Sequence, residues 1–273
     1  MQSWWRGRML MLKLTHDSYH SNAANTAYMS CSLYKSFMTC EARTMAKLNG
    51  AWVDEPSIAL MVGQYVHSFN DNSRDKFIAK NPSMFKKDLS LKAEFVIADK
   101  MIETLSSDEM VMYCLEGEKE VILTVDMFGA TWKGMLDVQN IERRRIVDLK
   151  TTRSITEKTW SEKDRCKVSF IEAYNYHLQS SLYSEVERIA MNRPEGDYSE
   201  FLIVAVSKEK SPDKAIINMT DPERLVRELA EVERNMPRIL AVKAGEVEPI
   251  RCEMCDFCRS TKTLTKAIHY SEL

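Results

Sequence analysis

Residues 134–152 have the sequence GMLDVQNIERRRIVDLKTT. Branched and apolar residues at both ends of this stretch predict two β-strands, about 131–138 and about 145–150. The polar segment between them contains three consecutive arginines and predicts a charged hairpin turn. We therefore expect an antiparallel pair of strands, around which the rest of the chain is organised.

Two acidic residues and a lysine fall at the ends of these strands. Because side chains alternate between the faces of a strand, Asp148 and Lys150 should share one face while Leu149 points to the other. Asp137 can bring a second carboxylate beside them. Carboxylates can hold Mg²⁺, which prefers oxygen ligands, and a lysine can orient a water molecule or stabilise a pentavalent transition state. Metal-assisted hydrolysis of a phosphodiester requires this combination.

A simpler interpretation applies to the same residues. Asp148 and Lys150 could form an ordinary ion pair on an exposed strand face, and such pairs contribute little to stability. Whether the pair is catalytic or only structural therefore depends on whether other motifs occur at suitable spacing elsewhere in the chain.

Composition places the chain among globular proteins. It has 273 residues, of which 44% are hydrophobic, and only 8 Gly and 7 Pro, which argues against long disordered linkers. The net charge of −2 gives no sign of nucleic-acid binding, although the basic clusters at 143–145 and 86–92 could contact phosphates or simply be solvated. Without an apolar run of about 18 residues, we expect no membrane span, and without a secretion signal we expect a cytoplasmic location.

Hydrophobic periodicity divides the remaining chain into elements. Helices are expected at 30–48, 56–69, 91–105, 160–188 and 221–244, and further strands at 120–128, 201–206 and 215–219. This order predicts an α/β (α+β) fold with a central mixed sheet of about five strands flanked by helices. We expect an N-terminal tail over 1–25, a single domain over 26–260 and a second tail over 261–273.

Four short motifs follow one another along the chain. They are G-x-x-x-H at 63–67, G-x-x-D at 134–137, VDLKTT at 147–152 and Q-x-x-x-Y at 179–183. In this order they resemble the PD-(D/E)XK nuclease superfamily, which has a restriction-endonuclease-like core. Within it the chain looks most like the RecB-like branch and the RecE-type (exodeoxyribonuclease VIII-like) enzymes of phages and prophages. The resemblance covers about residues 30–260, and the proline of the family label is absent before Asp137.

The resemblance implies a role for each motif. The metal ligands, for Mg²⁺ or Mn²⁺, would be the side chains of His67, Asp137 and Asp148 and the backbone carbonyl of Leu149. Lys150 would be the catalytic lysine. Gln179 and Tyr183 lie four residues apart, hence on one helical face, and would line the site. Taken without the other motifs, His67 would more often be a core or boundary residue, and Tyr183 with Gln179 could equally be a core tyrosine and a neighbouring polar residue.

Three of the seven cysteines are closely spaced in RCEMCDFCR, as Cys252, Cys255 and Cys258. In some relatives, the AddB-type and CRISPR adaptation nucleases, one early and three late cysteines hold a [4Fe–4S] cluster. The resemblance therefore implies Cys40 as the fourth ligand. Four thiolates suit either an iron–sulfur cluster or Zn²⁺, and the final spacing is shorter here than in those relatives. Reduced free thiols are the simpler alternative.

Together these features predict a metal-dependent DNA exonuclease. Its relatives act on duplex ends and leave single strands for phage-type homologous recombination by an annealing protein. Two alternatives remain: a non-catalytic module that binds DNA ends, and an adaptation or repair endonuclease with an iron–sulfur cluster. The partners would be double-stranded DNA ends and a single-strand annealing protein in a bacterial or phage-infected cell, and a homo-oligomer closed around DNA would favour exonuclease action.

Overall fold

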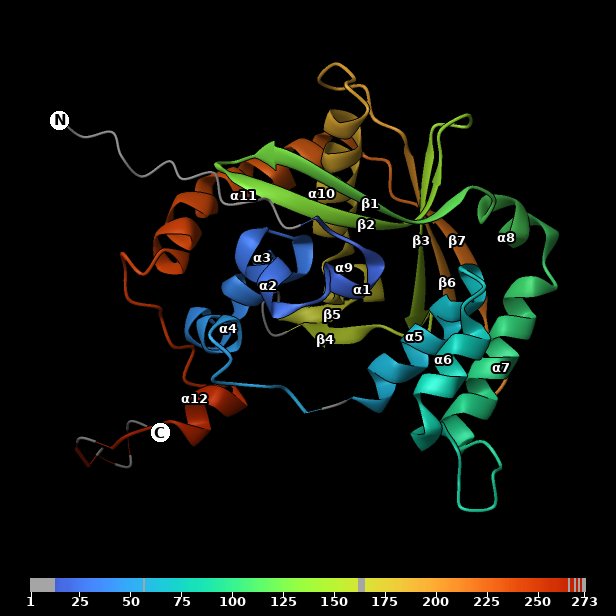
Figure 1. Cartoon of the computed structure of the whole chain (residues 1–273), viewed down its shortest axis with the longest axis horizontal. Helices are drawn as coiled ribbons and strands as arrows, with labels where there is room; N and C mark the ends of the chain where they lie inside the picture. Colours follow the sequence, from blue (N-terminus) through green and yellow to red (C-terminus); the bar gives the residue numbers. More distant parts are fainter. Residues whose placement is uncertain are drawn as a thin grey trace. The chain divides into compact units, whose positions relative to one another are not determined.

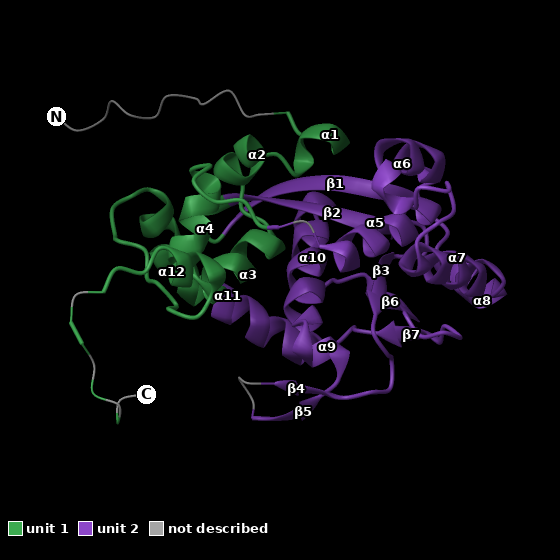
Figure 2. Cartoon of the chain, turned by 90° about the horizontal axis from the view of Figure 1, so that it is seen from below, with its two compact units in different colours: residues 1–54, 128–130, 233–273 green, residues 55–127, 131–232 purple. Residues whose placement is uncertain are grey.

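The computed structural model describes residues 13–55, 57–161, 165–264, 266–267, 269 and 271. Its chain forms two compact units (Figure 2). Unit 1 comprises residues 1–54, 128–130 and 233–273, and unit 2 comprises residues 55–127 and 131–232. Among the described helices, none has the length and apolar character that crossing a membrane requires.

Unit 2 is built on a five-stranded sheet (Figure 1). The strands are β1 (Glu118–Met127), β2 (Ala130–Asn140), β3 (Arg145–Thr152), β6 (Glu200–Ser207) and β7 (Lys214–Asn218), in the spatial order β1-β2-β3-β6-β7. β3 pairs antiparallel with β2 and parallel with β6, and β7 pairs antiparallel with β6 at the edge. The predicted mixed sheet with flanking helices is confirmed.

Apolar residues of β6 alternate between two packed faces of this sheet. Phe201, Ile203 and Ala205 pack in one cluster, while Leu202, Val204 and Val206 pack in another. The first cluster includes residues of α9 (Phe170–Ala173) and α10 (Tyr176–Ala190), and the second includes residues of α5 (Ile58–Asn70), α7 (Ala93–Ser106) and α8 (Glu109–Cys114). Helices on both sides explain why this strand is apolar without interruption.

The segment between residues 72 and 89 is partly helical. It contains α6 (Arg74–Lys80) and the 3₁₀ helix η1 (Pro82–Met84). The two helices are separated at Pro82, which cannot continue α6 and instead begins η1. Met84 anchors the segment, since it is completely buried in the α5–α7 cluster.

The prediction of a helix over 160–188 is wrong for residues 160–161 and 166–168. β4 (Thr159–Ser161) and β5 (Cys166–Val168) form a separate antiparallel hairpin, and residues 162–164 lie outside the described residues. The helical part is also divided in two. Ser169 caps α9 through Glu172 N–H, and Asn175, with φ of 50°, caps α10 through Leu178 N–H, so each helix starts anew.

Unit 1 is helical in its described part. It contains α1 (His16–Tyr19), α2 (Asn22–Ala27), α3 (Cys31–Thr39), α4 (Glu41–Leu48), α12 (Asp256–Ser260) and the second half of α11 (Pro222–Lys243). The single helix expected over 30–48 is broken at Cys40, whose extended backbone (φ −164°) makes it the N-cap of α4.

The expected N-terminal tail is in part structured. Within residues 13–25 the chain forms α1 and begins α2, and Tyr19 and Ala24 are buried there. Residues 1–12, and five residues of the expected tail over 261–273, lie outside the described residues. The single domain over 26–260 stays a prediction.

Candidate active site

Asp137 lies where β2 departs from regular alternation. Leu136 packs in the α9–α10 cluster, whereas Val138 packs in the α5–α7 cluster on the opposite face. Side chains two apart normally share a face, so an extra residue, a β-bulge, interrupts the strand here. The regular pairing with β3 includes Val138, opposite Val147, but not Asp137. Asp137 instead accepts a hydrogen bond from Leu149 N–H at its Oδ2, at 2.7 Å.

Helix α5 brings a histidine to the same carboxylate. His67 Nδ1 lies 3.5 Å from Asp137 Oδ2. One turn earlier, a Cβ added at Gly63 would lie 3.5 Å from Thr151 Oγ1, which shows how closely α5 approaches β3. The G-x-x-x-H motif therefore allows the helix to approach the sheet and places its histidine on Asp137.

A further residue of α5 was not predicted. Asn70, the last residue of the helix, donates from Nδ2 to the backbone carbonyl of Asp137 at 3.2 Å. Its Oδ1 accepts a hydrogen bond from Lys119 Nζ at 2.9 Å. Asn70 lies three residues after His67, hence on the same helical face. This spacing could have predicted from the sequence that Asn70 lies at the site. These contacts hold the backbone of Asp137 from the side of α5.

Asp148 and Lys150 form a buried pair. Lys150 Nζ lies 2.7 Å from Asp148 Oδ2, and the two side chains are only 16% and 4% exposed. The alternative of an exposed surface pair is therefore wrong. Gln179 donates from Nε2 to Asp148 Oδ1 at 2.9 Å, so both carboxylate oxygens have protein partners. Tyr176, which was also missed, places its ring centroid 5.1 Å from Lys150 Nζ.

Tyr183 takes a different position from Gln179. A Cβ built at Gly134 would lie 3.9 Å from Tyr183 Cδ1 and 3.4 Å from Val186 Cγ1. The absence of a side chain at Gly134 therefore lets α10 pack closely across β2. The structure places the ring of Tyr183 in this packing contact, whereas Gln179 reaches the carboxylate of Asp148.

The charged groups shift one another's proton affinity. Burial raises the pKa of Asp148; Lys150 acts to lower that pKa, but burial and the charge of Asp137 together outweigh Lys150. Burial also acts to raise the pKa of Asp137, but His67, Lys150 and the Leu149 N–H outweigh it and hold that pKa below its usual value. Burial acts to lower the pKa of Lys150 and of His67, yet the two carboxylates raise both. Lys150 therefore stays charged.

This donor set fits a divalent cation of the Mg²⁺ or Mn²⁺ type. The two carboxylates supply hard oxygen donors, and His67 adds a nitrogen donor that Mn²⁺ accepts more readily than Mg²⁺ does. The raised pKa of Asp148 reflects burial first and then repulsion from Asp137, and a bound cation would favour the charged carboxylate against both. The residues that sequence motifs predicted as ligands, His67, Asp137 and Asp148, thus lie together in unit 2.

A second centre lies in unit 1. The sulfur atoms of Cys40, Cys252, Cys255 and Cys258 all lie within 4.8 Å of one another. Cys258 Sγ is 3.6 Å from that of Cys40 and 3.9 Å from that of Cys252, and all four thiols are free of disulfides. A tetrahedral zinc site with Zn–S bonds of about 2.3 Å has sulfur–sulfur edges of about 3.8 Å. The four predicted cysteines therefore have the spacing of a one-metal site.

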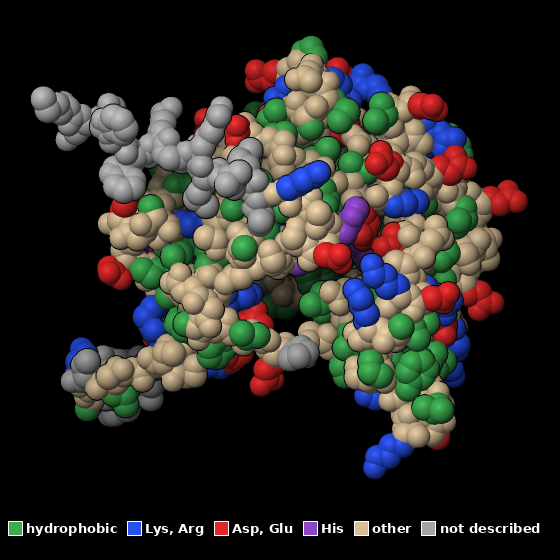
Figure 3. Space-filling model, in the orientation of Figure 1, with side chains coloured by type: hydrophobic (Ala, Val, Ile, Leu, Met, Phe, Trp, Pro, Cys, Tyr) green, Lys and Arg blue, Asp and Glu red, His purple; other side chains and the backbone are tan. Residues whose placement is uncertain are grey.

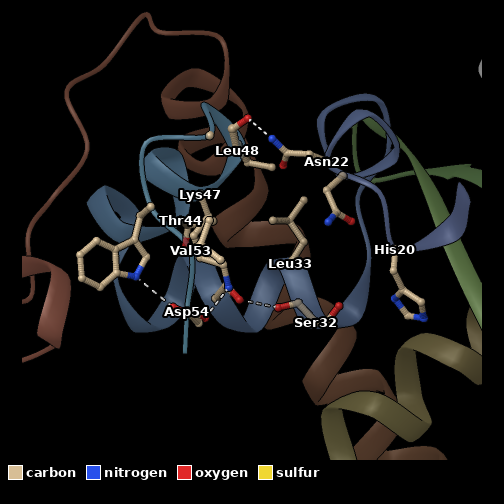
Figure 4. Close-up of a pocket in the computed structure, with 13 residues that line it drawn as sticks. His20, Asn22, Ser32, Leu33, Thr44, Lys47, Leu48, Val53 and Asp54 are labelled. Atoms are coloured by element: carbon tan, nitrogen blue, oxygen red, sulfur yellow. Dashed lines mark hydrogen bonds and ion pairs between the residues drawn. The ribbon is translucent and has the colours of Figure 1, made fainter. Parts of the chain in front are cut away.

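Unit 1 also contains a cavity of about 460 Å³ that is lined by both polar and apolar side chains (Figure 4). Its walls include Ser32 and Leu33 of α3, Thr44 and Lys47 of α4, and Asp54. Asp54 binds Lys47 at 2.8 Å and also accepts hydrogen bonds from Arg43 and Trp52. None of the predicted site residues lines this cavity.

Basic and acidic side chains are intermingled on the face of the molecule drawn in Figure 3. Of the basic cluster at 143–145, each arginine has an acidic partner in the structure: Glu116, Asp197 and Glu200. These arginines are therefore paired in the protein and do not form an open track for phosphates.

Comparisons with known proteins agree with this geometry. Residues 30–261 match the model of a family described as "PDDEXK-like domain of unknown function (DUF3799)". A crystal structure from Eubacterium rectale, described as "Putative exonuclease", is 42% identical, covers 96% of this chain and 98% of its own, and superposes with a TM-score of 0.88. A solved structure of SSO0001 is 12% identical with a TM-score of 0.29, and covers 83% of this chain and 91% of its own.

A search of curated proteins gives no match. The family model spans all four motifs on which the predicted resemblance to the PD-(D/E)XK superfamily depends, and the resemblance is confirmed at that level. The chain belongs to the PDDEXK-like family.

Proposed function

We propose that this protein is a deoxyribonuclease that hydrolyses phosphodiester bonds with the help of Mg²⁺ or Mn²⁺. The observation that carries the proposal is the buried Asp148–Lys150 pair beside Asp137, which brings two carboxylates and an ammonium group together. A non-catalytic binding module needs no such arrangement, since burying charged groups is costly. The family and the Eubacterium rectale relative support the same activity.

The metal would be held by Asp137, Asp148 and His67, with the Leu149 carbonyl as a fourth donor. When bound, it would lower the pKa of a water molecule and offset negative charge on the phosphate. The protein itself orients these groups: Leu149 N–H fixes Asp137, and Gln179 fixes Asp148. Lys150, charged at neutral pH, would hold a phosphate oxygen or the attacking water.

We further propose that the enzyme is an exonuclease of the RecE type, acting on duplex DNA ends. The description of the Eubacterium rectale relative supports exonuclease action, and the alignment covers 96% of this chain and 98% of the relative. The single strand produced would pass to an annealing protein in homologous recombination. We propose a cytoplasmic enzyme that can assemble around its DNA as a homo-oligomer.

Purified protein incubated with linear and with covalently closed circular duplex DNA tests these proposals. Degradation of linear DNA alone, dependent on Mg²⁺ or Mn²⁺, is expected. The Asp148→Asn variant serves as the control for contaminating nucleases. Cleavage of the circle would support the alternative of an endonuclease, and binding of ends without any cleavage would support the non-catalytic module.

For the second centre, we propose one structural Zn²⁺ bound by Cys40, Cys252, Cys255 and Cys258. The sulfur spacing supports zinc because a [4Fe–4S] cluster puts a separate iron under each thiolate and holds the sulfurs further apart. The first ligand and the last are 218 residues apart, so the metal would join distant parts of the chain within unit 1.

A further inference from the structure

A path of aromatic rings leads from Lys150 to the surface of unit 2. The ring centroid of Tyr176 lies 5.1 Å from Lys150 Nζ and 5.8 Å from the ring centroid of Tyr174, at an interplanar angle of 34°. Tyr174 is 56% exposed, and Trp160, on the adjacent hairpin, is 53% exposed. Large exposed aromatic side chains are costly in water and often mark binding surfaces.

These rings are held in place by the fold. Buried Phe170 packs its edge against Tyr176, with centroids 6.1 Å apart and planes at 75°. Tyr174 lies in the turn between α9 and α10, where the left-handed backbone of Asn175 and its cap on Leu178 N–H fix the geometry. Tyr174 and Tyr176 are therefore positioned before any ligand binds, which reduces the entropic cost of binding.

The β4–β5 hairpin places Trp160 beside a positive charge. Trp160 pairs directly with Lys167, so both side chains share one face of the hairpin. Both strands pack against α9, and the hairpin lies beside α9 in both Figure 1 and Figure 2. The described residues of this segment, 153–161 and 165–167, carry four basic side chains and one acidic side chain. This surface thus combines exposed rings with positive charge, which suits a nucleic-acid strand better than an apolar protein segment.

We propose that Trp160 and Tyr174 form an aromatic platform that stacks unpaired bases of the DNA strand being cut, with Lys167 near its phosphates. The proposal rests on the proposed nuclease function. Bases within a duplex are already stacked on their neighbours, so only a frayed or single-stranded end can reach the platform. The platform would select such an end regardless of sequence, because every base has a π-face.

The platform is tested with two kinds of substitution, one that removes the aromatic ring but keeps an apolar side chain and one that keeps a ring. Trp160→Leu and Tyr174→Leu remove the ring but keep apolar bulk, whereas Trp160→Phe and Tyr174→Phe keep a ring. Tyr113→Leu is the matched control, since Tyr113 is an exposed aromatic residue on α8. Binding of a fluorescein-labelled single strand of about 12 nucleotides is measured by anisotropy in EDTA, and kcat and KM are measured on linear duplexes with a single-stranded overhang.

Each leucine variant should weaken single-strand binding by about 5- to 150-fold, the range of losses for one stacked base. KM should rise while kcat changes little, because ground-state and transition-state binding are lost equally. The phenylalanine variants and Tyr113→Leu should stay within about threefold of the wild type.

Three results separate this proposal from the proposed nuclease function. Wild-type affinity in a Trp160→Leu/Tyr174→Leu double variant would overturn the platform even if cleavage is observed. Equal losses in leucine and phenylalanine variants would also overturn it, because stacking would not be the cause. Ring-dependent strand binding by a wild-type protein that never cleaves DNA would support the platform and refute the nuclease function.

Discussion

Gln179 donates a hydrogen bond from Nε2 to Oδ1 of Asp148 at 2.9 Å, and this contact fixes the carboxylate that also pairs with Lys150. Gln179 holds Oδ1 while Lys150 holds Oδ2, so the carboxylate of Asp148 is fixed from both sides and cannot rotate freely. In known metal sites, partners of this kind tune ligand geometry and metal affinity.

We therefore predict that Gln179→Ala lowers metal affinity or activity by about 10- to 100-fold, the usual cost of losing such a partner. Activity as a function of Mg²⁺ and Mn²⁺ concentration measures the effect. Tyr183→Phe, one turn further along α10, is the control and should keep near-wild-type activity, since the structure places this ring in packing against Gly134. Equal losses in both variants would mean that α10 as a whole, not the Gln179 amide, is disturbed.

The two aspartates should differ in what their removal does to folding. Asp148→Asn replaces a carboxylate whose pKa is already raised by burial and by Asp137, so folding should tolerate it. Asp137→Asn removes the charge of a carboxylate that accepts a hydrogen bond from Leu149 N–H and faces His67. It should therefore also lower the free energy of unfolding, by about 1–3 kcal/mol.

Calorimetric titration with Mn²⁺ and chemical denaturation of each variant check this prediction. Both variants should bind Mn²⁺ more weakly than wild type because each loses a charged oxygen ligand. Wild-type Mn²⁺ affinity in both would sink the assignment of Asp137 and Asp148 as ligands.

Replacing Lys150 should greatly reduce activity while the protein stays folded. Lys150→Met keeps the length of the side chain and removes its charge, and we expect activity to fall by about 10²- to 10⁴-fold. The raised pKa of Asp148 lets this carboxyl take up a proton once its partner is lost, which limits the cost to folding. Activity is compared with the far-UV circular dichroism spectrum. A variant that digests linear DNA at the wild-type rate would exclude a catalytic role for Lys150.

Sequence periodicity predicted the sheet because its strands are long enough to show a pattern. β6, with apolar residues on both faces, and the charged turn before β3 were both identifiable in this way. The β4–β5 hairpin was missed because each of its strands has only three residues, too few for alternation to be distinguished from a helical pattern.

Geometry at the site was harder to predict than its residues. The motifs named His67, Asp137, Asp148 and Lys150, and the structure brings them together. The bulge at Asp137 depends on which face its neighbours pack against, which no local pattern encodes. Tyr176, by contrast, precedes Gln179 by three residues, and helical spacing could have shown that they share a face.

Lys243 gives a pH-dependent prediction for unit 1. Its Nζ lies 3.3 Å from the carbonyl oxygen of Tyr28 and 3.9 Å from Met29 Sδ, and burial lowers its pKa to about 8. Between that value and the ordinary lysine pKa of about 10.4, the unfolded chain binds more protons than the folded one, so stability should rise with pH in this window.

The variant Lys243→Met isolates this effect. At pH 7 the wild type pays to bury the ammonium group, so the variant should be more stable, by on the order of 2 kcal/mol. The advantage should shrink as pH rises above 8 and disappear near pH 10.4. Urea denaturation at pH 7, 9 and 10.4 measures it, and a difference that does not depend on pH would show that packing rather than charge is responsible.

The four-thiol centre should contain one zinc ion per chain. The sulfur spacing of 3.6 and 3.9 Å around Cys258 matches a tetrahedral site, and Cys40 is held in it by the break between α3 and α4. Binding of metal by the folded chain adds directly to the free energy of unfolding. Cys255→Ser should therefore lower the melting temperature by on the order of 10 °C, while Cys166→Ser, which changes an exposed thiol outside the centre, should not. Mass-spectrometric metal analysis of protein purified without added metal, combined with the absorption spectrum, decides between the candidates. About four irons with a band near 400 nm would replace zinc by an iron–sulfur cluster, and four thiols that react freely in the native protein would remove the metal centre altogether.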